Sequence, residues 1–324
     1  MENDFSKTGF PLTHLWVFLF LLLTVFAVYG QVSDFSFISL DDEIYVSKNE
    51  KVLQGINREN ISWAFGFQDH ETYWHPVTWL SHMLDVEFFG IDPGLHHISN
   101  VIIHLCNAFF LYLLFVKSTG AIWRSCFVAL IFALHPLNVE SVAWIAERKN
   151  TLSTFFWFLT MLCYVQYVKR PSFFSYLLTL FVFVAGLLAK PMLVILPCVL
   201  LLFDYWPLGR FRFRKSTGKI SRKRLISEIF EMEKAKLLIV EKIPFLLFSF
   251  FAFYLTQYSI EKSAMNISFE TVPMIARLSN AFISYMNYAG KFICPINLAN
   301  FYPFPDSISL WMASGAVVWL ICMS

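Results

Sequence analysis

Apolar runs alternate with polar segments along the chain, and the length of these runs predicts helices that cross a membrane. A transmembrane helix needs about 20 mostly apolar residues. The runs that approach this length are 14–30, 98–116, 122–136, 150–168, 173–189, 191–203, 243–258 and 307–323. The first run lacks a basic start and a small-x-small cleavage site, so we interpret it as a retained anchor and not as a signal peptide.

The composition supports a membrane protein. The 324 residues are 57% hydrophobic and 15% charged, whereas soluble domains carry about 25% charged residues. We therefore predict an all-α polytopic membrane protein. The formal net charge is only +2, so we predict no nucleic-acid partner. The six Cys lie in apolar runs without paired spacing, which argues against a disulfide framework or a zinc knuckle.

The charged segments between the runs predict an orientation, because Lys and Arg concentrate on the cytoplasmic side. Residues 208–242 hold eleven Lys/Arg and four Asp/Glu, and residues 31–96 hold three and eleven. Strict alternation from a cytoplasmic N-terminus satisfies both counts. It makes 208–242 a basic cytoplasmic loop, whose run from Arg210 to Arg224 we expect to contact anionic lipid. It makes 31–97 a large first outer loop.

Two shorter helices are predicted between the apolar runs. Pro76 suits the first turn of a helix, and the residues after it divide into a polar and an apolar face. The polar face holds Thr78, His82 and Asp85, and the apolar face holds Leu80, Leu84 and Phe88. This pattern predicts an amphipathic helix in the membrane interface. Further along, Asn138 is placed to cap a short helix that ends at Arg148 and Lys149.

Three adjacent carboxylates, Asp41, Asp42 and Glu43, open the first loop. Repulsion between neighbouring carboxylates raises a pKa toward the range that a general base needs. In this interpretation one carboxylate accepts a proton from a substrate hydroxyl, and its neighbours tune or orient it. The alternative is a solvated acidic turn that caps the next helix. We favour catalysis because the triplet follows directly after a membrane span.

Polar residues also form a stripe on the second apolar run. His97, Asn100, His104 and Asn107 are spaced three, four and three, which predicts a face turned toward the bundle interior. For His104 and Asn107 we favour hydrogen bonding between helices. For His96 and His97, at the mouth of the run, binding of a phosphate is an equal alternative.

Basic residues on the predicted outer side are candidates for holding a lipid phosphate, which needs a cation at the interface. They are Arg148, Lys149, Lys190, Arg277 and Lys291. The alternatives are complementation of a helix dipole for Arg148 and Lys149, and snorkelling to the interface for Lys190. No His-Glu-x-x-His spacing predicts a metal site. We therefore assign no metal ligands and leave a divalent cation open.

Longer strings carry a family resemblance. They are Trp74-His-Pro-Val-Thr-Trp-Leu-Ser-His-Met-Leu-Asp85, Phe89-Gly-Ile-Asp-Pro-Gly-Leu-His-His97, Phe132-Ala-Leu-His-Pro-Leu-Asn-Val-Glu-Ser-Val-Ala-Trp-Ile-Ala-Glu-Arg-Lys149, Leu188-Ala-Lys-Pro-Met192, Leu202-Phe-Asp-Tyr-Trp-Pro-Leu208 and Asn300-Phe-Tyr-Pro303. These strings resemble bacterial members of the transmembrane and tetratricopeptide-repeat O-mannosyltransferase-like family over nearly all of residues 35–305. The resemblance implies the GT-C class, with many spans, a large first outer loop and a lipid-phosphate-linked sugar as donor.

The resemblance also implies roles for residues. The family's acidic first-loop motif falls on Asp41-Asp42, and the Asp-Glu pair of protein O-mannosyltransferases aligns with Asp42-Glu43, so Asp42 is the expected base. As an exposed loop carboxylate it should matter little for stability. The residues expected to bind substrate are Trp74, His75, Trp79, His82, Asp85, His96, His97, Glu140, Glu147, Arg148, Lys149 and Lys190. Family members continue into tetratricopeptide repeats, which we expect to be missing here after Ser324.

The expected function is that of an inverting glycosyltransferase in a bacterial inner membrane, with the Asp41-Asp42 loop on the periplasmic side. It would move a sugar such as mannose from a polyprenyl-phosphate donor to a hydroxyl of a glycan or of Ser/Thr in an exported protein. Arg148, Lys190 or His97 would hold the departing phosphate, and Trp74 and Trp79 would stack on the sugar. The main alternative is a non-catalytic membrane scaffold or lipid-phosphate-binding module. A weaker one is a proton-coupled transporter with the His97–His104 stripe as its relay.

Overall fold

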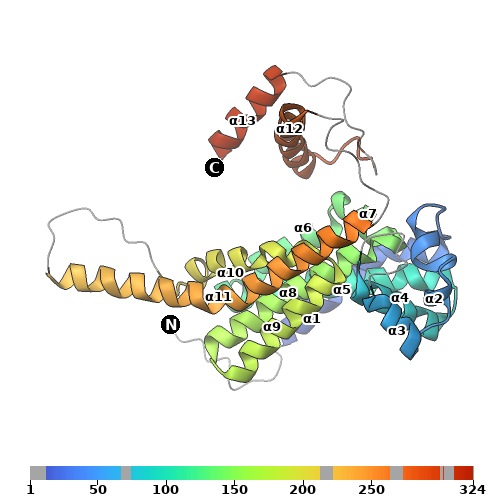
Figure 1. Cartoon of the computed structure of the whole chain (residues 1–324), viewed down its shortest axis with the longest axis horizontal. Helices are drawn as coiled ribbons and strands as arrows, with labels where there is room; N and C mark the ends of the chain where they lie inside the picture. Colours follow the sequence, from blue (N-terminus) through green and yellow to red (C-terminus); the bar gives the residue numbers. More distant parts are fainter. Residues whose placement is uncertain are drawn as a thin grey trace.

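The computed structural model describes residues 12–66, 74–211, 222–262, 273–299, 302 and 310–323. Every regular element within these ranges is a helix, as Figure 1 shows. Among the described residues, four helices are long and apolar enough to cross a membrane, and a fifth span results if one bent helix pair counts as a single crossing. The chain is therefore an all-α polytopic membrane protein, as its apolar runs predict.

The elements share a helical backbone and differ mainly in length. In chain order they are α1 (Leu12–Tyr29), η1 (Gly30–Asp34), η2 (Glu43–Ser47), α2 (Glu50–Leu53), α3 (Arg58–Phe65), α4 (Pro76–Phe89), α5 (Pro93–Thr119), α6 (Ile122–Leu134), η3 (Pro136–Asn138), α7 (Val139–Ala143), η4 (Ile145–Glu147), α8 (Arg148–Lys169), α9 (Phe173–Ala189), η5 (Pro191–Ile195), α10 (Leu196–Tyr205), α11 (Arg222–Lys262), α12 (Met274–Ile293) and α13 (Leu310–Met323).

The bundle is assembled around α5, which packs against α1, α6 and α8, while α8 packs against α9. One apolar core joins α1, α5 and α6 through residues such as Leu21, Ala108 and Ala129. A second core joins α8 to α11 and contains Phe183 and Phe245. Large apolar side chains on the outward faces remain exposed, which suits helices that meet lipid.

Gly186 allows the closest contact within the second core. A Cβ atom at this position would lie 2.3 Å from Leu193 Cδ2 and 2.8 Å from Phe156 Cβ. Any larger residue would therefore push α9 away from η5 and from α8. The close approach explains how two short elements, α9 and η5, dock tightly onto the longer α8.

The first loop folds into a small unit at one end of the bundle (Figure 1). Its core contains Tyr45, Trp79 and Met83, and it closes against Ile145 and Ala146 of η4. The helix predicted after Pro76 is confirmed as α4. Its polar face is the buried one, since Thr78, His82 and Asp85 are covered, whereas Leu84 and Phe88 are exposed. Protein contacts, and not water, therefore cover its polar residues.

Two predicted boundaries are wrong. The predicted basic loop 208–242 is helical from Arg222 onward, because α11 runs for 41 residues with Pro244 inside it. Its polar half, residues 222–242, holds four Lys and four Glu, which favour helix. Positions 212–221 of the basic run lie outside the described residues, as does the string Asn300–Pro303 except for Tyr302.

The second wrong boundary concerns Arg148 and Lys149, which begin α8 and do not end the preceding helix. The short α7 stops at Ala143 because Trp144 has an extended backbone. Asn138 makes no capping hydrogen bond. Its side chain instead donates to the Phe132 carbonyl at 2.6 Å. The chain therefore turns sharply through η4 and buries both basic residues at the start of a long helix.

Candidate active site

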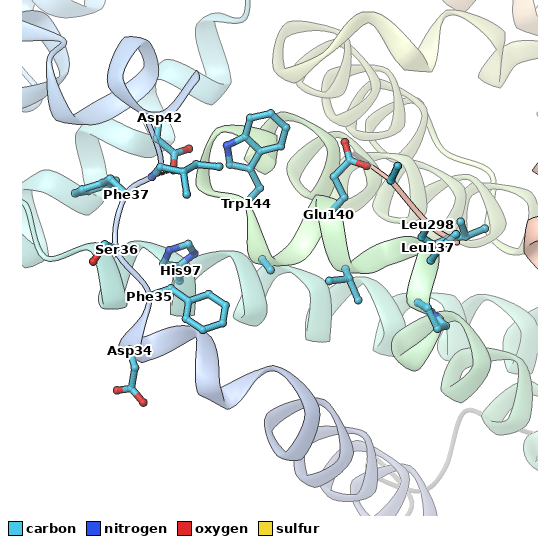
Figure 2. A pocket seen from close by; sticks show the side chains of 15 residues that line it. Asp34, Phe35, Ser36, Phe37, Asp42, His97, Leu137, Glu140, Trp144 and Leu298 are labelled. Carbon is cyan, nitrogen blue, oxygen red and sulfur yellow. Dashed lines mark hydrogen bonds between the residues drawn. The ribbon is translucent and has the colours of Figure 1, made fainter. Parts of the chain in front are cut away.

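A cavity of about 820 Å³ lies where the segment after α1 meets the η3–α7 segment. Figure 2 shows the side chains that line it. They are Asp34, Phe35, Ser36, Phe37, Ile38, Asp42, His97, Pro136, Leu137, Val139, Glu140, Ala143, Trp144, Leu298 and Ala299. The wall is mostly apolar, and ionisable groups are contributed by Asp34, Asp42, His97 and Glu140. The cavity thus combines an apolar surface with a small set of acid–base groups.

Asp42 is fully buried, with a relative exposure of 0%. Its Oδ2 accepts a hydrogen bond from the Ile38 N–H at 3.1 Å, and its Oδ1 accepts one from the Ala146 N–H at 2.9 Å. Burial raises the pKa of Asp42, and the two N–H donors and the nearby His97 offset part of that rise. A carboxylate has about four lone-pair sites, so each oxygen retains room for a further proton donor. The prediction of an exposed loop carboxylate is wrong, because the first loop folds over it.

The three adjacent carboxylates diverge in space. Asp41 is partly exposed and lies 3.5 Å from Lys149 Nζ. Glu43 pairs with Lys48 at 2.7 Å on the surface. Of the three, Asp42 lines the cavity, and its side chain makes no helix-capping bond to η2. The acidic-turn alternative therefore does not describe Asp42.

A chain of polar side chains extends from Asp41 along the start of α8. Lys149 Nζ lies 2.9 Å from Glu147 Oε1 and 4.7 Å from the centre of the Tyr45 ring. Asn150 hydrogen-bonds to both Glu147 and Lys190. Burial lowers the pKa of Lys190, while Glu147 acts in the opposite direction. Lys190 therefore points into this polar chain, and snorkelling is not what the structure shows.

The guanidinium of Arg148 makes its contacts with other residues of the protein. It is buried, and its Nη1 lies 2.5 Å from Asp85 Oδ2. Its Nε donates to Asn100 Oδ1 at 2.7 Å, and its Nη2 donates to the His96 carbonyl at 2.8 Å. These contacts tie α8 to α4 and α5. They favour a structural role for Arg148 and Asp85 over binding of a phosphate.

The histidine stripe on α5 is buried, as predicted. His104 Nε2 lies 2.9 Å from the Ala133 carbonyl, and Asn107 Nδ2 donates to the Thr151 carbonyl at 2.8 Å. These bonds between helices confirm the favoured role of both residues. His96 Nε2 lies 3.0 Å from the Gly90 carbonyl, whereas His97 lines the cavity beside Asp42.

The two aromatic residues predicted to stack on a sugar differ in how far they are buried. Trp79 is 1% exposed, stacks on Tyr45 with ring centroids 4.6 Å apart and meets Trp63 edge-on. Trp79 therefore forms the core of the first loop, and the prediction that its face meets a sugar is wrong. Trp74 is half-buried. His75 and His82 are buried, and burial lowers the pKa of His82 well below its ordinary value.

Several residues of the cavity were missed from the sequence. Phe35, Ser36, Phe37 and Ile38 follow α1 directly, and their position between a span and the acidic triplet was the available signal. Trp144 lies inside one of the strings quoted above. Arg277 and Lys291 do not line this cavity. In the described part of the chain, no group of three or more His, Cys, Asp or Glu could hold a metal ion.

Comparison with known proteins finds partial similarity to protein O-mannosyl-transferases. Protein O-mannosyl-transferase tmtc2 of Xenopus laevis is 30% identical over 113 residues, which are 32% of this chain and 12% of that protein. TMTC1 of Homo sapiens is 27% identical over 175 residues, 50% of this chain and 20% of that protein. Tmtc2 of Drosophila melanogaster is 26% identical over 223 residues, 64% of this chain and 23% of that protein.

The aligned part of the chain therefore spans less than a quarter of the length of each of these curated relatives. No family model and no solved structure matches the chain. The partial similarity supports a likeness to the TMTC protein O-mannosyl-transferases.

Proposed function

We propose that the chain carries the site of an inverting glycosyltransferase that moves a sugar from a polyprenyl-phosphate donor to an acceptor hydroxyl. The observation that carries this proposal is Asp42, a buried carboxylate held by two backbone N–H groups at an apolar-walled cavity. An apolar wall suits the hydrocarbon part of such a donor, and a buried carboxylate with free lone pairs suits a general base.

In this mechanism Asp42 accepts the proton of the acceptor hydroxyl as the hydroxyl oxygen attacks the anomeric carbon. The bond from that carbon to the phosphate oxygen breaks, and its electron pair leaves with the phosphate. A pKa raised by burial brings Asp42 closer to neutral pH, which favours proton transfer. The growing charge on the phosphate needs nearby cations, for which Lys149, Lys190 and His97 are the candidates.

The remaining details complete the proposal. The sugar is mannose or a related hexose, and the acceptor is Ser/Thr of an exported protein or a glycan hydroxyl. The first loop lies on the periplasmic side of a bacterial inner membrane, and the basic segment that includes Arg210 lies in the cytoplasm. A Cys introduced at Ser47 should then react with an impermeant thiol reagent in intact cells.

A second candidate is a membrane module that binds lipid phosphate without catalysis. Asp42 already has a backbone partner on each oxygen, and Lys149 and Lys190 have protein partners as well. The contacts that these three groups make within the protein favour a structural role for them over a role in catalysis. The two candidates differ in whether a sugar is transferred.

The deciding experiment measures transfer of label from polyprenyl-phosphate sugars to membrane proteins. Asp42→Asn removes the basic group while preserving size, so transfer should fall by roughly 10²–10⁴-fold, the usual contribution of a general base. Donor binding should persist. Asp41→Asn is the matched control and should retain more activity. Unchanged transfer in Asp42→Asn would refute Asp42 as the base. Donor binding without transfer by the wild type would favour the second candidate.

A further inference from the structure

One side chain of α5 ties down the η4 turn on both of its sides. Asn100 Nδ2 donates to the carbonyl of Trp144, the residue before the turn, at 3.0 Å. Asn100 Oδ1 accepts from Nε of Arg148, the residue after it, at 2.7 Å. Asn100 is 0% exposed. Both ends of a three-residue turn are therefore fixed to one amide that solvent does not reach.

The same turn supplies one of the two donors that hold Asp42. The N–H of Ala146, the central residue of η4, donates to Asp42 Oδ1 at 2.9 Å. Ala146 is fully buried. A shift of the turn would therefore either draw the carboxylate along or break its bond to the Ala146 N–H, since no water can take the place of that donor.

We propose that Asn100 is a positioning residue for Asp42: by fixing both ends of the η4 turn, it fixes the Ala146 N–H and thereby the carboxylate at the cavity. The proposal rests on the proposed function for the role of Asp42 as a base. Asn100 does not line the cavity, so its effect passes through the turn and not through substrate.

Arg148 gives Asn100 a rigid point of attachment. The guanidinium is itself held by Asp85, by the His96 carbonyl and by the Ser81 carbonyl at 3.3 Å. A supporting shell whose own rotamers are locked is what keeps a reactive group within tenths of an ångström of its working position. The amide of Asn100 therefore connects Asp42 to the packing of α4 and α5.

Asn107 provides a matched control on the same face of α5. It is 1% exposed, and its Nδ2 donates to the Thr151 carbonyl at 2.8 Å. Its truncation removes a buried bond from an α5 amide to a backbone carbonyl, the same kind of bond that Asn100 makes to Trp144. Thr151 lies inside α8 and beyond η4. Asn107→Ala therefore reports the structural cost of losing such a bond without releasing the turn.

The first test needs no transfer activity. Amide hydrogen exchange of the purified full chain is measured by mass spectrometry for peptides that cover residues 144–149. In Asn100→Ala the Ala146 amide should exchange at least tenfold faster than in the wild type. In Asn107→Ala this segment should exchange at the wild-type rate. Equal exchange of residues 144–149 in the two variants would overturn the proposal.

The second test measures transfer against pH. A misplaced base costs up to about 10²-fold in rate, so Asn100→Ala should lower kcat by roughly 10- to 100-fold with little change in the KM for donor. Loss of an N–H donor also favours the protonated carboxyl, so the acid limb of the profile should move to higher pH. His97 faces Asp42 from α5, Asp41 and Glu43 flank it in the chain, and Lys149 lies beyond Asp41. All four remain in both variants.

Asn107→Ala should keep the wild-type pH profile. A profile that moves equally in both variants would overturn the positioning role. A wild type with no transfer activity would refute the proposed function, while the exchange experiment would still decide whether Asn100 holds the turn. If Asn100→Ala cannot be recovered from membranes, Asn100→Ser is judged by the same exchange criterion.

Discussion

Two buried groups of charge in this bundle are built in opposite ways. The first, which we call the Lys242 cluster, consists of Tyr164, Asp204, Arg210, Glu241 and Lys242. Lys242 Nζ lies 2.8 Å from Asp204 Oδ2 and 3.0 Å from Glu241 Oε1. Arg210 Nη1 lies 3.2 Å from Asp204 Oδ1, and its Nη2 lies 2.9 Å from Glu241 Oε2. Every carboxylate oxygen of the cluster thus meets a cation.

The second group is Asp42 with its neighbours. Both oxygens of Asp42 accept from neutral backbone N–H groups, and the nearby Lys149 pairs with Glu147 and Asp41. Within the described part of the chain, Asp42 is therefore a buried carboxylate without a direct cation, beside a cavity. Burying a carboxylate without a cation is unfavourable in free energy. The arrangement is therefore better explained by a function than by a contribution to stability. Carboxylates whose oxygens all meet cations indicate a structural role. A buried carboxylate that meets only backbone N–H groups, beside a cavity, indicates a reactive group.

The comparison predicts the largest loss of stability at Lys242. Lys242→Met leaves Asp204 and Glu241 with Arg210 as their one cation among the described residues, and breaking a buried pair on one side costs about 3–5 kcal/mol. Unfolding in detergent, followed by heat or denaturant, measures this change. The double variant with Asp204→Asn should recover part of the loss, because it removes the uncompensated carboxylate.

Lys236→Met is the control on the same helix. Lys236 pairs with Glu233 at 2.8 Å, and both side chains are more than half exposed. An exposed pair of this kind contributes about 0–1 kcal/mol. If Lys242→Met proved as harmless as Lys236→Met, the Lys242 cluster would not be a structural tie.

An intermediate loss is predicted at Lys149. Lys149→Met removes the pair with Glu147 and the contact with the Tyr45 ring, while Glu147 keeps its bond to Asn150. We expect a loss of about 1.5–3 kcal/mol, the range for a hydrogen bond to a charged group. Label transfer should fall at least tenfold, since Lys149 is a proposed phosphate partner. If Lys149→Met lost as much stability as Lys242→Met and kept wild-type label transfer, both groups of charge would have the same structural role.

Much of the fold follows from the apolar runs. The run 173–189 coincides with α9, and the stripe on α5 faces the interior as its spacing predicts. The start of α11 was not predicted, because helix formers such as Lys and Glu extend the helix well before the apolar run 243–258. Arg210 was expected to meet lipid, but it lies in the Lys242 cluster. Its partners come from α10 and α11, and only the folded chain brings them together.

The candidate site was less predictable. The acidic triplet was a candidate because carboxylates beside a span are unusual, and the family resemblance singled out Asp42 within it. The donors to Asp42 could not be predicted, since any residue offers a backbone N–H, and Ala146 lies 104 positions away. Trp79 was assigned to the wrong role because an aromatic ring suits a sugar face and an apolar core equally well. Which of the two applies depends on the fold of the loop around it.

The smallest predicted effect is the pH dependence of stability that Asp42 introduces. Burial raises its pKa in the folded chain, whereas in the unfolded chain an Asp titrates near about pH 4. The folded state therefore binds this proton more tightly. The contribution of Asp42 to stability is then fully present below about pH 4 and is lost as the pH rises through the folded-state pKa. Asp42→Asn lacks this titration.

The melting temperature of the wild type minus that of Asp42→Asn should therefore fall as the pH rises from about 4 toward neutral. Subtracting the two curves cancels the other titrating groups, which are common to both proteins. Asp41→Asn is the control, because it removes a partly exposed neighbouring carboxylate and leaves Asp42 in place. A difference for Asp42→Asn that rose with pH would mean that an unseen cation stabilises its charge. Asp42 would then be paired with a cation, as the carboxylates of the Lys242 cluster are, and would not be a reactive carboxylate.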